Sequence, residues 1–274
     1  MPNEEIKGGM RVRKFCSIVK LTFLTNFAYI KAFWLNIVGT AVSIIVYYFL
    51  WQFVFQKQDT IAGFAMEQMT TYVILSRILS SQFSGGINME FAEWIYEGTI
   101  GMELLRPVSL FFNLFAKRMG EFLFFVVFKG LPITVVCLLV MGGSAPFGVT
   151  QFLLFVASVV ISIGIMFFIE FMVGLCSFYT FNNHGLRFMK SSLLSILSGG
   201  VVPIFFFPEA IVKVLNYMPF AGMVSVPVQI YMGEYGMAES VKYIVLQIIW
   251  CILLFGFAKF FYAKSIRKVV VQGG

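Results

Sequence analysis

Long apolar runs, separated by short polar stretches, recur along the whole chain. A run of about 20 apolar residues can cross the hydrocarbon core of a bilayer, about 30 Å thick, as a helix. The pattern predicts six membrane-spanning helices, near residues 33–55, 69–83, 119–141, 150–181, 191–207 and 243–262. We therefore expect an all-α polytopic membrane protein, with residues 1–274 forming a single transmembrane domain.

Two further apolar segments do not fit a spanning helix. In residues 12–32, basic side chains alternate with aromatic and aliphatic ones, which predicts an N-terminal amphipathic helix in the cytoplasmic membrane interface. Residues 205–236 are also apolar, but Pro208, Pro219 and Pro227 interrupt them. There we expect short re-entrant helices on the extracellular side before the last span, with their backbone groups buried against protein.

The distribution of lysine and arginine predicts the orientation. These residues gather before the first predicted span, after the second, after the fourth and after the sixth, whereas the other loops hold few of them. Cytoplasmic loops retain Lys and Arg, so an even number of spans with both termini in the cytoplasm fits every loop. On this topology residues 85–117 lie inside, and residues 56–68 and 142–149 lie outside.

Composition supports the same class. Of the 274 residues, 59% are hydrophobic and 12% are charged, and mean hydropathy is +0.89, whereas soluble domains carry about 25% charged residues. In so apolar a chain the net charge of +7 reflects membrane orientation, and we expect a lipid bilayer and no nucleic acid as partner. Cys16, Cys137, Cys176 and Cys251 lie far apart, which predicts free thiols.

Catalytic motifs are absent from the sequence. There is a single histidine, no cluster of Cys and His at metal-binding spacing, and no Gly-Lys dipeptide of the kind that a P-loop needs. We therefore expect no metal, no cofactor and no catalytic residue in this chain. If ATP drives the protein, another polypeptide must bind the nucleotide.

Four ionisable residues fall inside the predicted spans: Arg77, Glu121, Lys129 and Glu170. Such residues are costly in lipid and face the protein interior or a cavity. Lys129 and Glu170 fall at similar depth at about 1.5 Å per residue, which predicts an ion pair, and Arg77 is predicted to pair with Glu121. These pairs would fix helix register. The alternative role is a polar path or a proton relay.

Two segments carry a resemblance to a known family. Residues 93–109, "EWIYEGTIGMELLRPVS", and residues 201–233, "VVPIFFFPEAIVKVLNYMPFAGMVSVPVQIYMG", resemble the permease subunits of type 2 ABC exporters. The first segment is similar to the G-x-I-x-x-x-L-L-R-P element of one bacterial branch, the ABC-2 family transporters. The resemblance covers nearly the whole chain.

This resemblance implies a non-catalytic transport subunit in the bacterial cytoplasmic membrane. It implies a dimer, with a second copy of this chain or with a paralogous permease, bound to two copies of an ABC ATPase that holds ATP and Mg. Substrates of relatives include drugs, antibiotics, peptides and lipid-like molecules, moved outward. The alternatives are a secondary transporter or channel that needs no ATPase, and a structural or regulatory membrane protein.

The resemblance also places a coupling helix in residues 85–107, between spans two and three. Helical spacing puts acidic side chains on one face, at i, i+3 and i+7: Glu90, Glu93 and Glu97. We expect this face to meet the ATPase, and Phe91 and Trp94, on another side, to anchor the helix to the permease. Arg106 and Pro107 are expected to end the helix. The alternative is a helix lying on lipid headgroups, which its acidic face disfavours.

Overall fold

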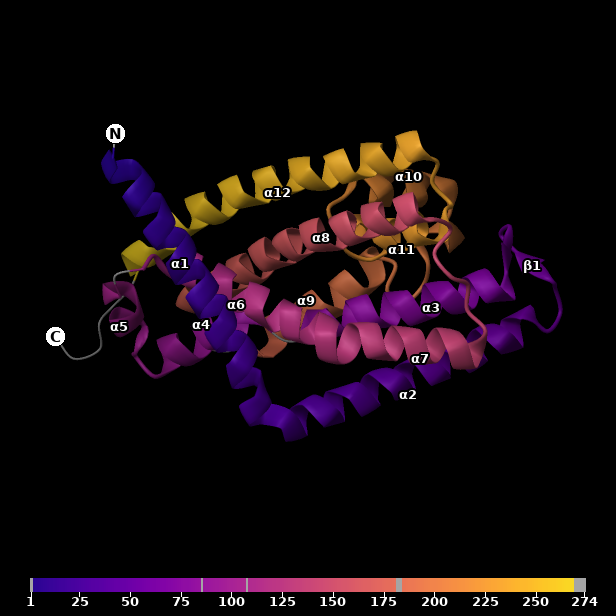
Figure 1. The fold of residues 1–274 in the computed structure, drawn as a ribbon, viewed down its shortest axis with the longest axis horizontal. Helices are drawn as coiled ribbons and strands as arrows, with labels where there is room; N and C mark the ends of the chain where they lie inside the picture. Colours follow the sequence, from indigo (N-terminus) through magenta and orange to yellow (C-terminus); the bar gives the residue numbers. More distant parts are fainter. Residues whose placement is uncertain (1, 85, 107, 181–183, 269–274) are drawn as a thin grey trace.

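The computed structural model describes residues 2–84, 86–106, 108–180 and 184–268 (Figure 1). The longer helices are α1 (Pro2–Thr25), α2 (Ile30–Phe55), α3 (Met66–Ser80), α6 (Leu110–Phe125), α7 (Leu131–Met141), α8 (Val149–Leu175), α9 (His184–Leu197) and α12 (Met237–Ser265). The shorter ones are α4 (Ile87–Tyr96), α5 (Ile100–Leu105), α10 (Glu209–Tyr217) and α11 (Ser225–Met232). Strands β1 (Thr60–Ile61) and β2 (Phe64–Ala65) form a small hairpin. The all-α prediction is confirmed.

Four of the described helical segments are long and apolar enough to cross a membrane: Val12–Phe55, Leu110–Met141, Val149–Phe178 and Met237–Ser265. Their outer faces carry exposed apolar side chains, such as Leu35 on α2, Leu139 on α7 and Ile252 on α12. Water would penalise so much exposed apolar surface, whereas lipid accepts it. These segments define a polytopic membrane protein.

Two predicted spans correspond to shorter helices. The predicted span 69–83 is α3 followed by a 3₁₀ turn, η2 (Ser81–Ser84), and most side chains of α3 are buried. The prediction for 191–207 was wrong in its limits, because α9 begins at His184 and ends at Leu197. Gly199 adopts a positive φ of 81° just beyond α9, a conformation that favours glycine and ends the helix.

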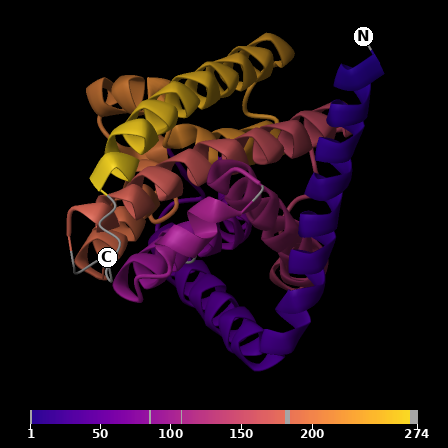
Figure 2. The ribbon, with the colours of Figure 1, turned by 90° about the vertical axis from the view of Figure 1, so that its left-hand side faces the viewer.

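The N-terminal helix α1 joins α2 through a 3₁₀ turn, η1 (Asn26–Tyr29), and packs along α6. Phe15 of α1 lies edge-on to Phe112, and Phe23 lies edge-on to Phe124. The basic side chains of Arg13, Lys14 and Lys20 are exposed, so the helix is amphipathic, with its aromatic face on α6. Figure 2 shows α1 at one side of the bundle and α12 at another.

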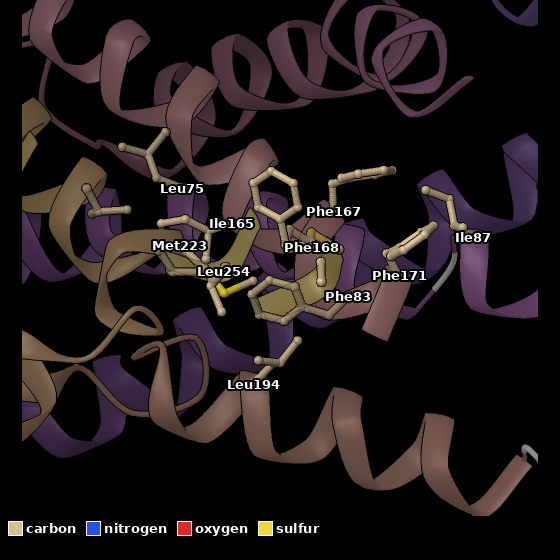
Figure 3. Packing of buried hydrophobic residues seen from close by; sticks show 14 of the residues in the cluster. Leu75, Phe83, Ile87, Ile165, Phe167, Phe168, Phe171, Leu194, Met223 and Leu254 are labelled. Carbon is tan, nitrogen blue, oxygen red and sulfur yellow. The ribbon is translucent and has the colours of Figure 1, made fainter. Parts of the chain in front are cut away.

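The hydrophobic core lies around α8, which packs against α12, α11 and α4. Phe167 and Phe171 of α8 are fully buried and lie in one cluster with Phe83 of η2 (Figure 3). The segment predicted as re-entrant holds α10 and α11, and all residues of α11 are buried. These two helices lie at the end of the molecule opposite α4 and α5 (Figure 1).

Candidate functional site

The predicted coupling segment folds as two helices instead of one. α4 ends at Tyr96, and Gly98 follows with a positive φ of 72°, where glycine avoids the penalty of a side chain. α5 then runs to Leu105, and Arg106, which precedes a proline, is extended. The predicted limits of the segment, residues 85 and 107, lie outside the described residues. Arg106 thus ends α5, and the prediction that it ends a single helix was wrong.

One face of α4 packs on α8. Phe91 is fully buried against Phe171, and the absence of a side chain at Gly174 leaves room for its ring, because a Cβ there would lie 2.7 Å from Phe91 Cδ2. Trp94 is partly buried next to Phe91, and the Nζ of Lys117 lies 5.3 Å from its ring centroid. The α4 helix is therefore held by α8 and α6.

The predicted acidic residues of α4 have two different environments. Glu93 and Glu97 are exposed. Glu90 is partly buried and forms an ion pair with Lys117 of α6, with Oε2 and Nζ 2.8 Å apart. The exposed acidic surface is thus made by Glu93 of α4 and by Glu97, the residue directly after α4, while Glu90 helps to fix the helix to the bundle.

Beside the beginning of α4, a network of charged side chains surrounds Glu170 of α8, whose exposed fraction is 0%. Its Oε1 lies 3.3 Å from Nζ of Lys190 on α9, and its Oε2 lies 3.7 Å from Nε of Arg118 on α6. Arg118 also binds Glu121, with Nη1 and Oε2 3.1 Å apart. Two cations and two anions thereby connect the three helices α6, α8 and α9, and we call these four residues the Glu170 network.

The Glu170 network also touches the beginning of α4. Gly86, the residue before α4, has a positive φ of 116° and lies so close to Glu170 that a Cβ would overlap the carboxylate. A carboxylate near the start of a helix interacts favourably with its unpaired N–H groups and its dipole. Glu170 therefore lies where α4, α6, α8 and α9 meet.

Lys129 lies on a π-helical turn, η3 (Val126–Gly130), between α6 and α7. Pro132 has no N–H to donate, and its ring crowds the carbonyl of residue 128. The N–H of Leu131 bonds to the carbonyl of Val126, five residues before it, whereas an α-helix would use the carbonyl four residues before it. The predicted pair of Lys129 and Glu170 was wrong. The Nζ of Lys129 donates hydrogen bonds to Asn36 Oδ1 and Ser81 Oγ.

The predicted pair of Arg77 and Glu121 was also wrong. Arg77 donates to the carbonyl of Gly200, and its guanidinium lies 4.2 Å from the ring centroid of Tyr47. Glu121 pairs with Arg118 on its own helix instead. The depth estimate compared only the ionisable residues inside the predicted spans, so it considered neither the neutral partners of Arg77 nor Arg118, which precedes the third predicted span.

Sequence reasoning missed Arg118 and Lys190, which it placed in cytoplasmic loops. Both side chains are buried. The i, i+3 spacing of Arg118 and Glu121 on one helix was the available signal for the first. For Lys190 no comparable signal existed, because its partner Glu170 lies 20 residues away on another helix.

Two hollows lie beside these charges. One, of about 380 Å³, opens between the start of α2, η2 and α6. The other, of about 400 Å³, is lined by polar side chains of α2, α3 and α9, including Thr40, Ser43 and Arg77. Within the described part of the chain, no group of three or more His, Cys, Asp or Glu residues is placed to hold a metal ion.

The fold and these features define a helical, multi-pass membrane protein with a cluster of ionisable groups buried in its bundle. Residues 41–273 match the family described as ABC-2 family transporter protein, and the chain belongs to this family. It is therefore the permease type of ABC transporter component, which normally works with a separate ABC ATPase. No curated protein shows significant sequence similarity to it.

Proposed function

We propose that this chain is the membrane-spanning permease of an ATP-driven exporter in the bacterial cytoplasmic membrane. α4 is the docking element for the ATPase. The observation that carries this proposal is the exposed pair of Glu93 on α4 and Glu97 at its C-terminal end, because the other face of this helix is buried on α8. The family match supports the ATPase partner. ATP and Mg bind to that partner, and the chain itself binds neither.

The proposed topology has six spans, with α3 and α9 as the second and fifth, and both termini in the cytoplasm. A helix of 15 residues, the length of α3, rises only about 22 Å, which is shorter than a hydrocarbon core of about 30 Å. Burial of α3 among its neighbours supports a span that need not meet lipid along its length. The whole chain acts as one transmembrane domain.

The proposed assembly has two permeases, either identical or paralogous, and two ATPases. Substrate moves outward along the interface between the permeases. A drug, an antibiotic, a peptide or a lipid-like molecule suits so apolar a protein. The polar hollow around Arg77 supports a path that accepts polar groups.

The docking proposal is tested by charge reversal on α4. The chain is purified in mild detergent with its P-loop ATPase, identified by mass spectrometry, and compared with the Glu93→Lys/Glu97→Lys variant. Like charges across an interface are strongly unfavourable, so we expect recovery of the ATPase to fall at least about tenfold. Glu90 is left unchanged because it binds Lys117 within the permease.

The matched control is Glu209→Lys/Glu239→Lys. It makes the same change in charge on exposed acids of α10 and α12, at the end of the molecule opposite α4. It is expected to recover the ATPase as the parent does. If the α4 variant also binds the ATPase and stimulates its turnover normally, α4 is not the docking surface. If no P-loop ATPase accompanies the parent chain, the exporter proposal itself is wrong.

Topology is tested with single cysteines in a background without the four native ones. A cysteine at Ala145, which is exposed in the loop between α7 and α8, should react with a membrane-impermeant reagent in intact cells. A cysteine at Glu97 should react only after permeabilisation. The reverse pattern would overturn the proposed orientation.

A further inference from the structure

The hollow of about 380 Å³ is lined by residues from three parts of the fold. Polar and charged groups line it together with an aromatic wall: Asn26, Tyr29, Ala32, Phe33, Asn36, Ser81, Gln82, Gly86, Arg118, Glu121, Phe124, Phe125 and Lys129. It lies where the chain turns from α1 into α2, beside η2 and α6. Nothing in the docking proposal requires this hollow.

The charges around the hollow do not balance. The Glu170 network contains two cations and two anions, which compensate one another. Lys129 adds a further cation that is 3% exposed, and none of the ion pairs among the described residues includes it. Its two hydrogen-bond acceptors, Asn36 and Ser81, are neutral. A buried ammonium group without a counter-ion is costly, and an anion bound beside it would relieve that cost.

The walls of the hollow favour an amphiphile over a simple ion. Phe33, Phe124 and Phe125 form an apolar side, and the ring centroid of Phe125 lies 5.6 Å from Nζ of Lys129. Tyr29, at the rim, is 74% exposed, and tyrosine is typical of the level of lipid headgroups. A ligand with a negative head and an apolar tail would match both sides.

On the proposed topology the start of α2 lies at the cytoplasmic side, and we propose that this hollow binds the phosphate group of an anionic lipid from the leaflet on that side. Lys129 provides the charge, and the side-chain amide of Gln82 is a further donor on the lining. The amide of Asn26, by contrast, already donates one hydrogen bond to the carbonyl of Thr22. Glu121 lines the same hollow, but its carboxylate is engaged by Arg118. The lipid tail lies along the phenylalanine wall and leaves past Tyr29.

The experiment measures lipid binding to the full chain in mild detergent, without the ATPase. The chain is delipidated and titrated with phosphatidylglycerol or with phosphatidylcholine, and binding is followed by native mass spectrometry and by the rise in Tm. Phosphatidylglycerol should bind and stabilise the parent, and phosphatidylcholine, which has no net charge, should do so much less. Because no ATPase is present, the result is independent of the docking test.

The decisive variant is Lys129→Gln, which removes the charge but keeps a hydrogen-bond donor. Loss of one charged hydrogen bond should weaken phosphatidylglycerol binding about tenfold or more. Lys129→Arg should restore much of the affinity. The matched control is Lys31→Gln, an exposed lysine near the hollow that does not line it, and it should bind as the parent does. Equal binding by Lys129→Gln and the parent would overturn the proposal.

A second variant keeps the proposal testable if Lys129→Gln does not fold. Ala32→Phe fills the hollow from α2 and leaves every charge in place, so it should also lose phosphatidylglycerol binding. Inorganic phosphate and glycerol phosphate distinguish the source of the anion. If they stabilise the parent as strongly as phosphatidylglycerol does, the ligand is a soluble anion and the lipid proposal is wrong. If none of these probes binds, the hollow is not an anion site.

Discussion

Glu170 and Lys129 are both buried charges in the membrane bundle, yet their surroundings differ. Glu170 meets two cations from two other helices, and the beginning of α4 lies against it. Lys129 meets neutral oxygen atoms and borders a hollow. In the first arrangement the charges are balanced within the chain, which is typical of a structural role. The second leaves a charge that a ligand can satisfy.

Removing the charge of Glu170 should produce the largest loss of stability. In Glu170→Gln, Lys190 loses its ion-pair partner and Arg118 loses one of two carboxylates. Breaking a buried ion pair from one side costs about 3–5 kcal/mol. We expect a fall of that size in the free energy of unfolding, measured by denaturant titration of the purified chain in detergent.

A double variant serves as control for this prediction. Glu170→Gln/Lys190→Met removes both members of one pair and should be more stable than Glu170→Gln alone, because no lysine remains buried without its partner. Additive losses from the two substitutions would show that the pair does not couple α8 to α9.

The contact between Gly86 and Glu170 should be the next most sensitive. Gly86→Ala places a side chain at a positive φ and against the carboxylate, and backbone strain alone costs about 1–3 kcal/mol. Gly101→Ala in α5, where a Cβ would meet nothing within 4 Å, is the matched control and should stabilise the chain slightly. Equal unfolding curves for parent and Gly86→Ala would remove the proposed link between α4 and the Glu170 network.

Removing the charge of Lys129 should have the smallest effect on stability. Lys129→Met gives up two hydrogen bonds to neutral acceptors but also relieves the burial of a charge without a counter-ion. We expect the free energy of unfolding in delipidated detergent to change by less than about 1 kcal/mol, since the loss of the hydrogen bonds and the relief of charge burial offset each other. A loss as large as that of Glu170→Gln would indicate a hidden counter-ion and would erase the contrast between the two sites.

Sequence patterns predicted most of the long helices because lipid demands only length and apolar composition. For this reason α2 and α12 cover their predicted spans, and α8 covers most of the span predicted at 150–181. The predicted end of α9 was too late because the apolar run continues past Gly199. The backbone conformation of Gly199 ends the helix, and its carbonyl accepts a hydrogen bond from Tyr72. Apolar character alone does not locate such a turn.

The candidate site was predictable only in part. The exposure of Glu93 and Glu97 and the burial of Phe91 follow from helical spacing, whereas their roles in docking stay predictions. The partners of Lys129 and Glu170 could not be read from depth, because they depend on which helices are neighbours. That choice is made by packing between distant segments, and a single sequence carries little trace of it.

The π-helical turn at η3 has a consequence for how the chain tolerates changes in length. Such a turn holds one residue more than an α-helix needs over the same distance. Deleting Val127, an exposed residue of this turn, should convert it to a regular α-helix and leave α6 and α7 facing their present neighbours. Deleting Val156 from α8 should instead rotate one half of that helix by about 100° relative to the other. The permease should therefore remain foldable when shortened at η3 and lose its fold when shortened by the same amount in α8.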